Sequence, residues 1–306
     1  MWGRWRWRTI AVNDSTSEAI VHRPHHHRVA LEQRGCSTHV EISVMGGFGV
    51  AVDGVSSPAA GWARRSASAL VKILALAPHH RLHRETVMDL LWPDEAPELS
   101  APRLHKAAHF ARRAAGRDDA VVLRDEAVSL FPGAEIIVDA VQFERLARMA
   151  VGQNDPDAAR DALAWYAGDL LPDDRYANWA VDRRELLHLR RLDVLRVAAE
   201  WRELTELNPL DEEAHMRVMR QHIDAGAGAA ALRQYEHLAR VLERDLGIAP
   251  GRAVREASVD ARDLARTHVA GSGVLVGTLL AELVDLVNRQ TALLAELAAA
   301  GARSVG

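Results

Sequence analysis

The sequence predicts a mainly α-helical protein whose first ordered part is a small α+β unit. Three observations carry this prediction. Runs that alternate apolar and polar residues, as strands do, occupy residues 39–57 and 121–131. Between them, three segments repeat apolar residues at helical spacing. After residue 138 the chain is rich in Ala, Leu and Arg and shows no further strand pattern, which predicts an all-helical domain.

The first strand region, HVEISVMGGFGVAVDGVSS, contains Asp53-Gly54, a dipeptide that is favoured in tight hairpins. We therefore expect short antiparallel strands. Gly47 and Gly49 lie within this hairpin and not between a strand and a helix, so they are interpreted as structural residues.

Three helices and a second hairpin follow. Residues 64–77 form an amphipathic helix that ends at Pro78, and residues 85–92 form a short helix closed by Pro93. An acidic connector, residues 94–99, leads into a third helix over residues 100–116. Residues 121–131 then form a hairpin that turns near Asp125-Glu126.

The third helix is apolar on one side and basic on the other. Between residues 99 and 117 there are five Lys or Arg residues and no acid. The buried stripe is Leu104, Ala107, Ala108, Ala111 and Ala115, and the opposite stripe is Arg103, Lys106, Phe110, Arg113 and Arg117. A solvated surface helix shows the same pattern, but the neighbouring elements favour a helix that reads DNA.

A sheet, three helices and a hairpin are the elements of a winged helix-turn-helix, whose third helix enters the major groove of DNA. The residues predicted to read bases are Arg103, Lys106, His109, Phe110 and Arg113. Those predicted to contact the DNA backbone are Arg64, Arg65, His105, Arg112, Arg117 and Arg124. Phe110 has two interpretations, contact with a thymine methyl group or packing against the wing or a helix.

The helical domain is interrupted at residues 154–156, 171–173 and 208–209. Its best-defined pair of helices, residues 211–225 and 229–246, is similar to a tetratricopeptide hairpin, in which Ala214, Val218, Leu232, Tyr235 and Leu238 are placed to pack. Residues 139–265 carry 18 basic and 24 acidic side chains, whereas residues 40–133 carry 11 of each. The helical domain is thus a poor candidate for DNA binding. It is expected to bind a peptide, a ligand or a second subunit, or to support the first domain.

Both ends of the chain leave alternatives open. Residues 1–38 are expected to be a disordered arm. Its run of alternating Trp and Arg has three interpretations: stacking on nucleic acid, contact with a membrane surface, or no function. Its histidines (His22, His25, His26 and His27) favour a flexible tail over a metal site.

Residues 274–300 form an amphipathic C-terminal helix with apolar residues at heptad spacing: Val276, Leu279, Leu283, Leu286, Leu293 and Leu297. A short coiled coil, and hence a homodimer, is preferred over a helix that folds back on the second domain. Charged residues in its middle exclude a membrane span.

The sequence offers little support for an enzyme, a cofactor or a bound metal. It has no phosphate-binding loop of the type Gly-x-x-x-x-Gly-Lys-Ser/Thr and no spacing of a zinc hydrolase. Its lone cysteine, Cys36, excludes an intramolecular disulfide. No export signal or membrane span is recognised, which favours the cytoplasm.

From about residue 40 to residue 251 the chain resembles the SARP-type bacterial transcription activators, which join an OmpR-like winged helix to a bacterial transcriptional activation domain. The stretches that carry the resemblance are GGFGVAVDG, DLLWPDEAP, RLHKAAHFARRAAG, VDAVQFERLA, WYAGDLLPDDRYANWAVDRRE, NPLDEEAHMRVM and AALRQYEHLARVLERDLGIAP. The resemblance implies an activator that binds double-stranded DNA and recruits RNA polymerase. It also implies that the connector from Trp92 to Pro102 contacts the polymerase, through Trp92, Pro93, Asp94, Glu95 and Glu98.

Two departures from the family pattern stand out. Arg103 follows Pro102 where many relatives start the recognition helix with Ser or Asn, and Ala199 occupies a turn where Gly is usual. The first leaves the operator sequence open, and the second leaves the local turn open.

The expected organisation is an arm over residues 1–38, a winged helix over 39–133, a helical domain over 138–265 and the C-terminal helix over 274–300. Two functions fit it. One is a sequence-specific DNA-binding activator; the other is a protein-interaction module with a vestigial winged helix. The basic stripe without acids favours the first.

Overall fold

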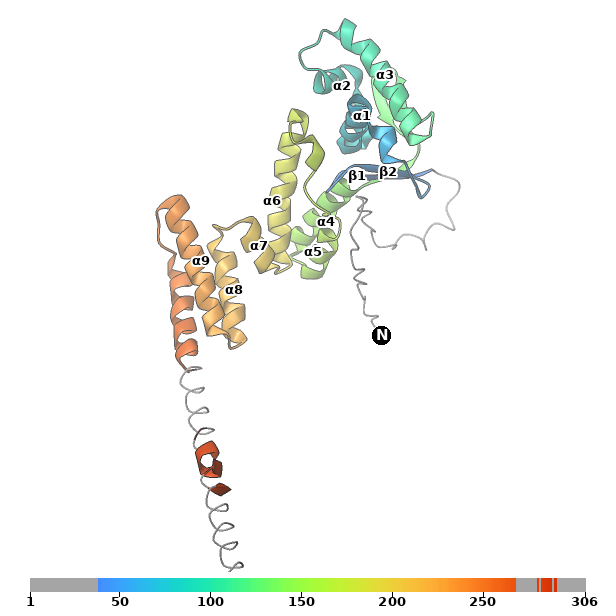
Figure 1. Cartoon of the computed structure of the whole chain (residues 1–306). Coiled ribbons are helices and arrows are strands. Elements are labelled where there is room, and N and C mark those ends of the chain that lie inside the picture. The colour runs from blue at the N-terminus through green and yellow to red at the C-terminus, as the bar shows by residue number, and fades with distance from the viewer. Residues whose placement is uncertain (1–37, 268–279, 281, 288, 291–306) are drawn as a thin grey trace, which may run out of the picture. The chain divides into compact units, whose positions relative to one another are not determined.

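The computed structural model describes residues 38–267, 280, 282–287 and 289–290. The predicted arm, with its Trp-Arg run, its histidines and Cys36, lies outside the described residues, except for Thr38. Of the predicted C-terminal helix, the described residues between 280 and 290 are helical, and the others lie outside the description. The fold is mainly helical with a small β region near its N-terminal end, as predicted (Figure 1).

The first sheet has four strands in the order β3-β2-β1-β7. β1 (His39–Ser43), β2 (Gly49–Val52) and β3 (Val55–Ser56) are antiparallel, as predicted. Asp53 and Gly54 both have positive φ, 49° and 80°, which is the conformation that a tight hairpin turn requires. The fourth strand, β7 (Glu135–Val138), runs parallel to β1 and was missed by the sequence analysis.

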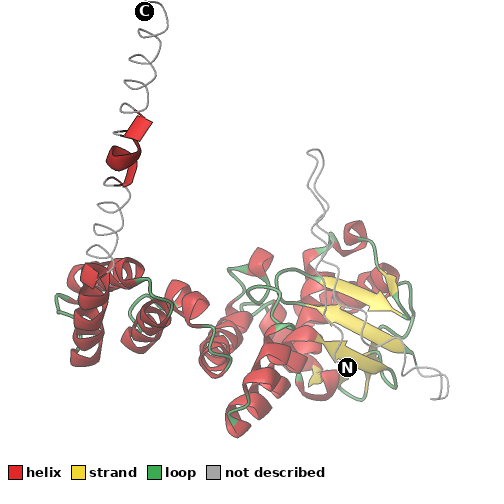
Figure 2. Ribbon diagram, turned by 90° about the horizontal axis from the view of Figure 1, so that it is seen from below, coloured by secondary structure: helices red, strands yellow, loops and turns green. Residues whose placement is uncertain are grey.

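A second sheet and three helices complete the winged helix (Figure 2). The helices are α1 (Arg65–Leu76), α2 (Arg84–Leu91) and α3 (Pro97–Ala115). The sheet has the order β4-β6-β5, in which β5 (Val121–Arg124) and β6 (Ala127–Leu130) form the predicted hairpin. β4 (Arg81–His83) is too short to show a periodic pattern, and it pairs with β6 between α1 and α2.

The predicted connector is corrected by the structure. Residues 94–99 were expected to form a connector, and the resemblance implied a loop from Trp92 to Pro102, but α3 already begins at Pro97. Proline suits the first helical position because its φ is fixed and its missing N–H is not needed there. Pro102 lies inside the helix, where it removes one hydrogen bond to the exposed Glu98 without ending the helix. The connector is therefore limited to residues 92–96.

The helical domain contains the following helices: α4 (Asp139–Gln153), α5 (Pro156–Leu163), α6 (Val181–Val197), α7 (Trp201–Leu207), α8 (Glu212–Asp224), α9 (Gly228–Leu246) and a helix over residues 252–267. The three predicted interruptions lie where α4 meets α5, between α5 and α6, and between α7 and α8. The predicted hairpin is formed by α8 and α9. Ala214, Val218 and Leu238 are buried in it, and Leu232 and Tyr235 pack against its core.

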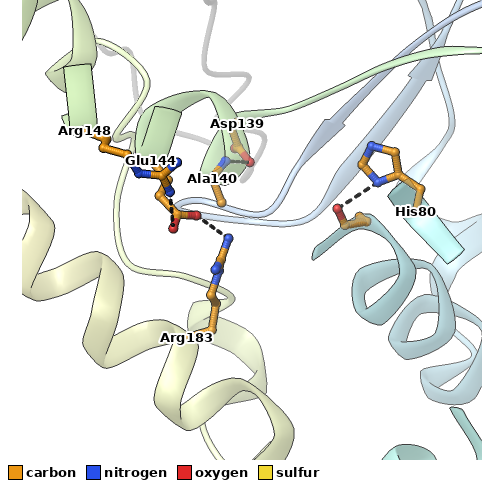
Figure 3. A network of polar contacts seen from close by, with 7 residues as sticks. His80, Asp139, Ala140, Glu144, Arg148 and Arg183 are labelled. Atoms are coloured by element: carbon orange, nitrogen blue, oxygen red, sulfur yellow. Dashed lines mark hydrogen bonds and ion pairs between the residues drawn. The ribbon is translucent and has the colours of Figure 1, made fainter. Parts of the chain in front are cut away.

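One apolar core extends from Val40 in β1 to Ala198 at the end of α6. Buried Asp139, the first residue of α4, helps to join the two parts of the chain. Its carboxylate accepts hydrogen bonds from the backbone N–H groups of Val44 (2.9 Å), Met45 (3.0 Å) and Ala140 (2.8 Å), the last of which is seen in Figure 3. Near it, Glu144 forms ion pairs with Arg148 and Arg183 (Figure 3). The winged helix is thus built onto the start of the helical domain.

A search of the described residues for helices long and apolar enough to cross a lipid bilayer found none.

Candidate nucleic-acid interface

α3 presents one buried face and one exposed face, as its sequence predicts. Its five predicted apolar positions are all buried in the winged-helix core. Because four of these are alanines, the helix backbone packs closely against α1 and the wing. On the opposite side, four of the predicted base-reading residues are exposed: Arg103, Lys106, His109 and Arg113. His105, which is predicted to contact the DNA backbone, is also exposed.

The start of α1 lies beside this face and shares an open hollow of ≈ 550 Å³ with it. The hollow is lined by Arg64, Arg65, Ser66, Ala69, Leu91, Trp92, Arg103, Lys106 and Phe110. Arg64 caps α1 without a side-chain hydrogen bond, and the first turn of the helix contains no acid. Free N–H groups and a positive helix dipole therefore combine here with two arginines, an arrangement suited to a phosphate group.

Phe110 lies beneath one of these arginines. The guanidinium carbon of Arg64 is 3.8 Å from the centre of the Phe110 ring, which is half-buried and packs against the core. His109 meets the same ring edge-on at 5.4 Å. This geometry favours the interpretation that Phe110 packs and orients Arg64. Contact between Phe110 and a thymine methyl group stays a prediction.

Arg103 is held by the connector between α2 and α3. Its guanidinium forms an ion pair with Glu95 and lies 4.7 Å from the centre of the Trp92 ring. Both partners are among the residues that the resemblance assigns to polymerase contact. This ion pair between Glu95 and Arg103 could not be predicted from the sequence, because residues eight positions apart across a loop follow no periodic pattern.

Of the other residues predicted to contact the DNA backbone, two form hydrogen bonds within the protein and one is exposed to solvent. Arg112 is half-buried and donates from Nε to the carbonyl oxygen of Val121 (2.8 Å), which fastens α3 to the wing. Arg117 binds Asp119 and the hydroxyl of Thr38, and its hydrogen bond lowers the pKa of Asp119. Arg124 is exposed at the tip of the wing. The structure thus brings Arg64, Arg65, Arg103 and Lys106 together and uses Arg112 and Arg117 within the fold.

Comparisons with known proteins bear on both parts of the chain. Residues 138–260 match the family model of the bacterial transcriptional activator domain. Among solved structures, the fold is similar to that of EmbR from Mycobacterium tuberculosis, determined in complex with a low-affinity phosphopeptide. The TM-score is 0.52 and the sequence identity 19%, over 78% of this chain and 71% of that chain. No curated protein matches the sequence.

Residues 138–260, which make up most of the helical domain, thus match a bacterial transcriptional activator domain, and the likeness to EmbR concerns the fold. Together with the winged helix that precedes it, this domain defines the class of architecture to which the chain is similar.

Proposed function

We propose that the chain binds double-stranded DNA in a sequence-specific way and activates transcription by recruiting RNA polymerase. Arg103, Lys106, His109 and Arg113 on α3 enter the major groove, where Arg and Lys donate to guanine N7 and O6. Arg64 and Arg65, at the start of α1, bind a phosphate of the DNA backbone.

The observation that carries the proposal is the hollow shared by the start of α1 and the middle of α3. It gathers four cationic side chains, Arg64, Arg65, Arg103 and Lys106, from two elements. Two of the four are predicted base readers and two are predicted phosphate contacts, so one DNA duplex can use both kinds of contact at once.

The connector supplies the proposed polymerase contact. Pro93, Asp94 and Ala96 are exposed, and Glu98 and Leu99 are exposed on the first turn of α3, Leu99 with 66% of its surface accessible. These side chains are therefore accessible to a protein partner.

The first experiment is a selection of bound fragments from a random DNA pool, with the wild-type protein and with an Arg103→Ala, Lys106→Ala double variant. We expect the wild-type protein to enrich one motif. The double variant is expected to lose preference at the guanine positions, because each good base contact contributes about 1–3 kcal/mol of discrimination. Affinity should also fall with salt, with a slope of about −0.9 per phosphate neutralised in log affinity against log salt.

A matched control removes the same charge elsewhere. Arg240 and Arg252 are exposed residues of α9 and of the helix over residues 252–267. The Arg240→Ala, Arg252→Ala variant is expected to keep the wild-type motif. If folded wild-type protein enriches no motif, the interaction-module function is favoured instead.

We also propose that the protein is a homodimer through its C-terminal helix. Leu283 and Leu286 in the described part of that helix are 61% and 58% exposed, and both belong to the predicted heptad seam. Light scattering after size exclusion should show a dimer for the wild-type protein and a monomer for a Leu283→Glu, Leu286→Glu variant. Glu282→Gln, an exposed change on the same helix, is the control.

A further inference from the structure

A second hollow lies in the helical domain, where α7, α8 and α9 are neighbours in the chain and in space (Figure 1). Its volume is ≈ 430 Å³, within the range of about 300–1,000 Å³ that is usual for small-molecule sites. It is lined by Arg202, Thr205, Glu206, Pro209, Val218, His222, Gln234 and His237. None of these residues belongs to the proposed DNA interface.

Two arginines lie in or beside this pocket. Arg202 lines it, and Arg233 is close enough to act on His222. Within the described part of the chain neither arginine forms an ion pair, although acids outnumber bases in this domain. Burial lowers the pKa of His222, and the positive charges of Arg202 and Arg233 lower it further. The pocket therefore offers Arg202 as a cation without an ion-pair partner among the described residues, with Arg233 nearby and Glu206 as the acid of the lining.

Two lining residues of the pocket, Gln234 and His237, contact the buried side chain of His215. His215 is fully buried, and its Nδ1 is 2.8 Å from the amide nitrogen of Gln234. Its ring stacks on that of His237, with the ring centres 5.8 Å apart. Burial lowers the pKa of His215, and the neighbouring His237 does so as well, which keeps the ring neutral and able to accept from Gln234. Gln234 and His237 are thus held in place before any ligand arrives.

We propose that this pocket binds a small organic anion, whose carboxylate or phosphate group is held by Arg202 and His222. Thr205 and Gln234 add uncharged hydrogen-bonding groups to the lining. Glu206, the acid of the lining, accepts hydrogen bonds, so the preferred ligand carries a hydroxyl or amino group beside its anionic group. This binding goes beyond the proposed function and does not depend on DNA.

The proposal gives a pH dependence with a definite sign. The groups around His222 are Arg202 and Glu206 on α7 and Arg233 and His237 on α9. A bound anion offsets the two arginines and raises the pKa of His222, because it favours the protonated ring. Binding then takes up a proton, and affinity increases as the pH falls through the range in which His222 titrates.

The test is isothermal titration calorimetry of the full chain with two probes, citrate and inorganic phosphate, against sodium chloride at equal ionic strength. Citrate offers carboxylates and a hydroxyl group, so stronger binding of citrate supports an organic acid, and stronger binding of phosphate supports a phosphate ester. Arg202→Gln and His222→Gln are expected to weaken binding about tenfold or more, because each removes a charge-assisted hydrogen bond. Arg252→Gln, on the next helix with an 88% exposed side chain, is expected to bind like the wild type.

Absence of saturable binding of either probe, or equal affinity in the Arg202→Gln variant, would overturn the proposal. A second measurement uses the wild-type protein alone, so that misfolding of a variant has no influence. The ring proton resonances of His222 should shift during titration with the anion. Binding heat without such a shift would place the anion elsewhere and would also contradict the proposal.

Discussion

Asp139 is the residue whose loss should harm the fold most. It is fully buried, and its carboxylate satisfies the backbone N–H groups of Val44, Met45 and Ala140. Asp139→Ala leaves these buried donors without their acceptor, which is expected to reduce the free energy of unfolding by about 3 kcal/mol. Guanidinium chloride unfolding, followed by circular dichroism, measures the change.

Asp157 is the matched control for this variant. It lies in the first turn of α5 with a 93% exposed side chain and pairs only with Arg160 among the described residues. Asp157→Ala is expected to cost about 1 kcal/mol or less. Equal losses of unfolding free energy in the two alanine variants would show that burial of the Asp139 carboxylate is not what stabilises the joint, the contact region between the winged helix and the start of the helical domain.

Ala199 is a residue at which the fold is strained. α6 ends in a Schellman motif, in which Glu200 N–H binds the carbonyl of Leu195 (3.0 Å) and Ala199 has a φ of 58°. That left-handed conformation costs an L-residue about 1–2 kcal/mol, part of which glycine recovers at the expense of a more flexible unfolded chain. Ala199→Gly is therefore expected to raise the free energy of unfolding by about 0.5–1 kcal/mol.

Thermal unfolding checks the sign of this effect. Ala164, an exposed residue at the end of α5, has an ordinary helical φ of −61°. Ala164→Gly should destabilise the protein by up to about 1 kcal/mol. Destabilisation by both glycines would contradict the assignment of strain to Ala199.

At the scale of elements, periodic segments were predicted well and short or interrupted ones were not. α1 and the hairpin of α8 and α9 were found because repeated apolar positions fix the buried face of a helix. β4 and β7 were missed because three or four residues define no period, and their pairing with β6 and β1 depends on distant parts of the chain. α3 was predicted to begin at residue 100 instead of Pro97, because the acidic residues 94–99 were interpreted as a connector.

The connector between α2 and α3 has a proposed role in polymerase contact, and its Glu95 also holds Arg103, a proposed base-reading residue. Glu95 pairs with Arg103, so a guanine that binds Arg103 must first displace the carboxylate. Since an exposed ion pair contributes about 0.2–1 kcal/mol, Glu95→Gln is expected to tighten DNA binding by about two- to fivefold. Fluorescence anisotropy with the selected DNA measures this affinity.

Glu98 provides a control of equal charge. It is exposed in the first turn of α3, and no contact of its side chain with Arg103 is present in the described structure. Glu98→Gln changes the general attraction to DNA by the same charge, so the difference between the two variants reports the ion pair alone. If both variants bind equally tightly, Glu95 does not compete with DNA for Arg103.

For the whole molecule, the sequence predicted which faces are exposed but not how the parts are joined. The basic face of α3 was predicted because an acid-free stripe is visible in the local sequence. The hollow shared by Arg64 and Arg103 depends on the packing of α1 against α3, which local periodicity does not specify. The same holds for the joint, in which Lys72 in α1 forms an ion pair with Asp174 (2.6 Å) more than 100 residues away.

This joint leads to a prediction about folding units. The expected division of the chain separates residues 39–133 from residues 138–265, yet β7, Asp139 and Phe143 complete the sheet and core that begin with Val40. A fragment of residues 38–133 would expose apolar surface that these elements cover in the full chain, whereas residues 38–198 contain the continuous core. We expect the longer fragment to unfold cooperatively and the shorter one to unfold at a much lower denaturant concentration. Amide resonance dispersion and guanidinium chloride unfolding of both fragments test this, and equal unfolding midpoints would instead show that the winged helix folds independently of the helical domain.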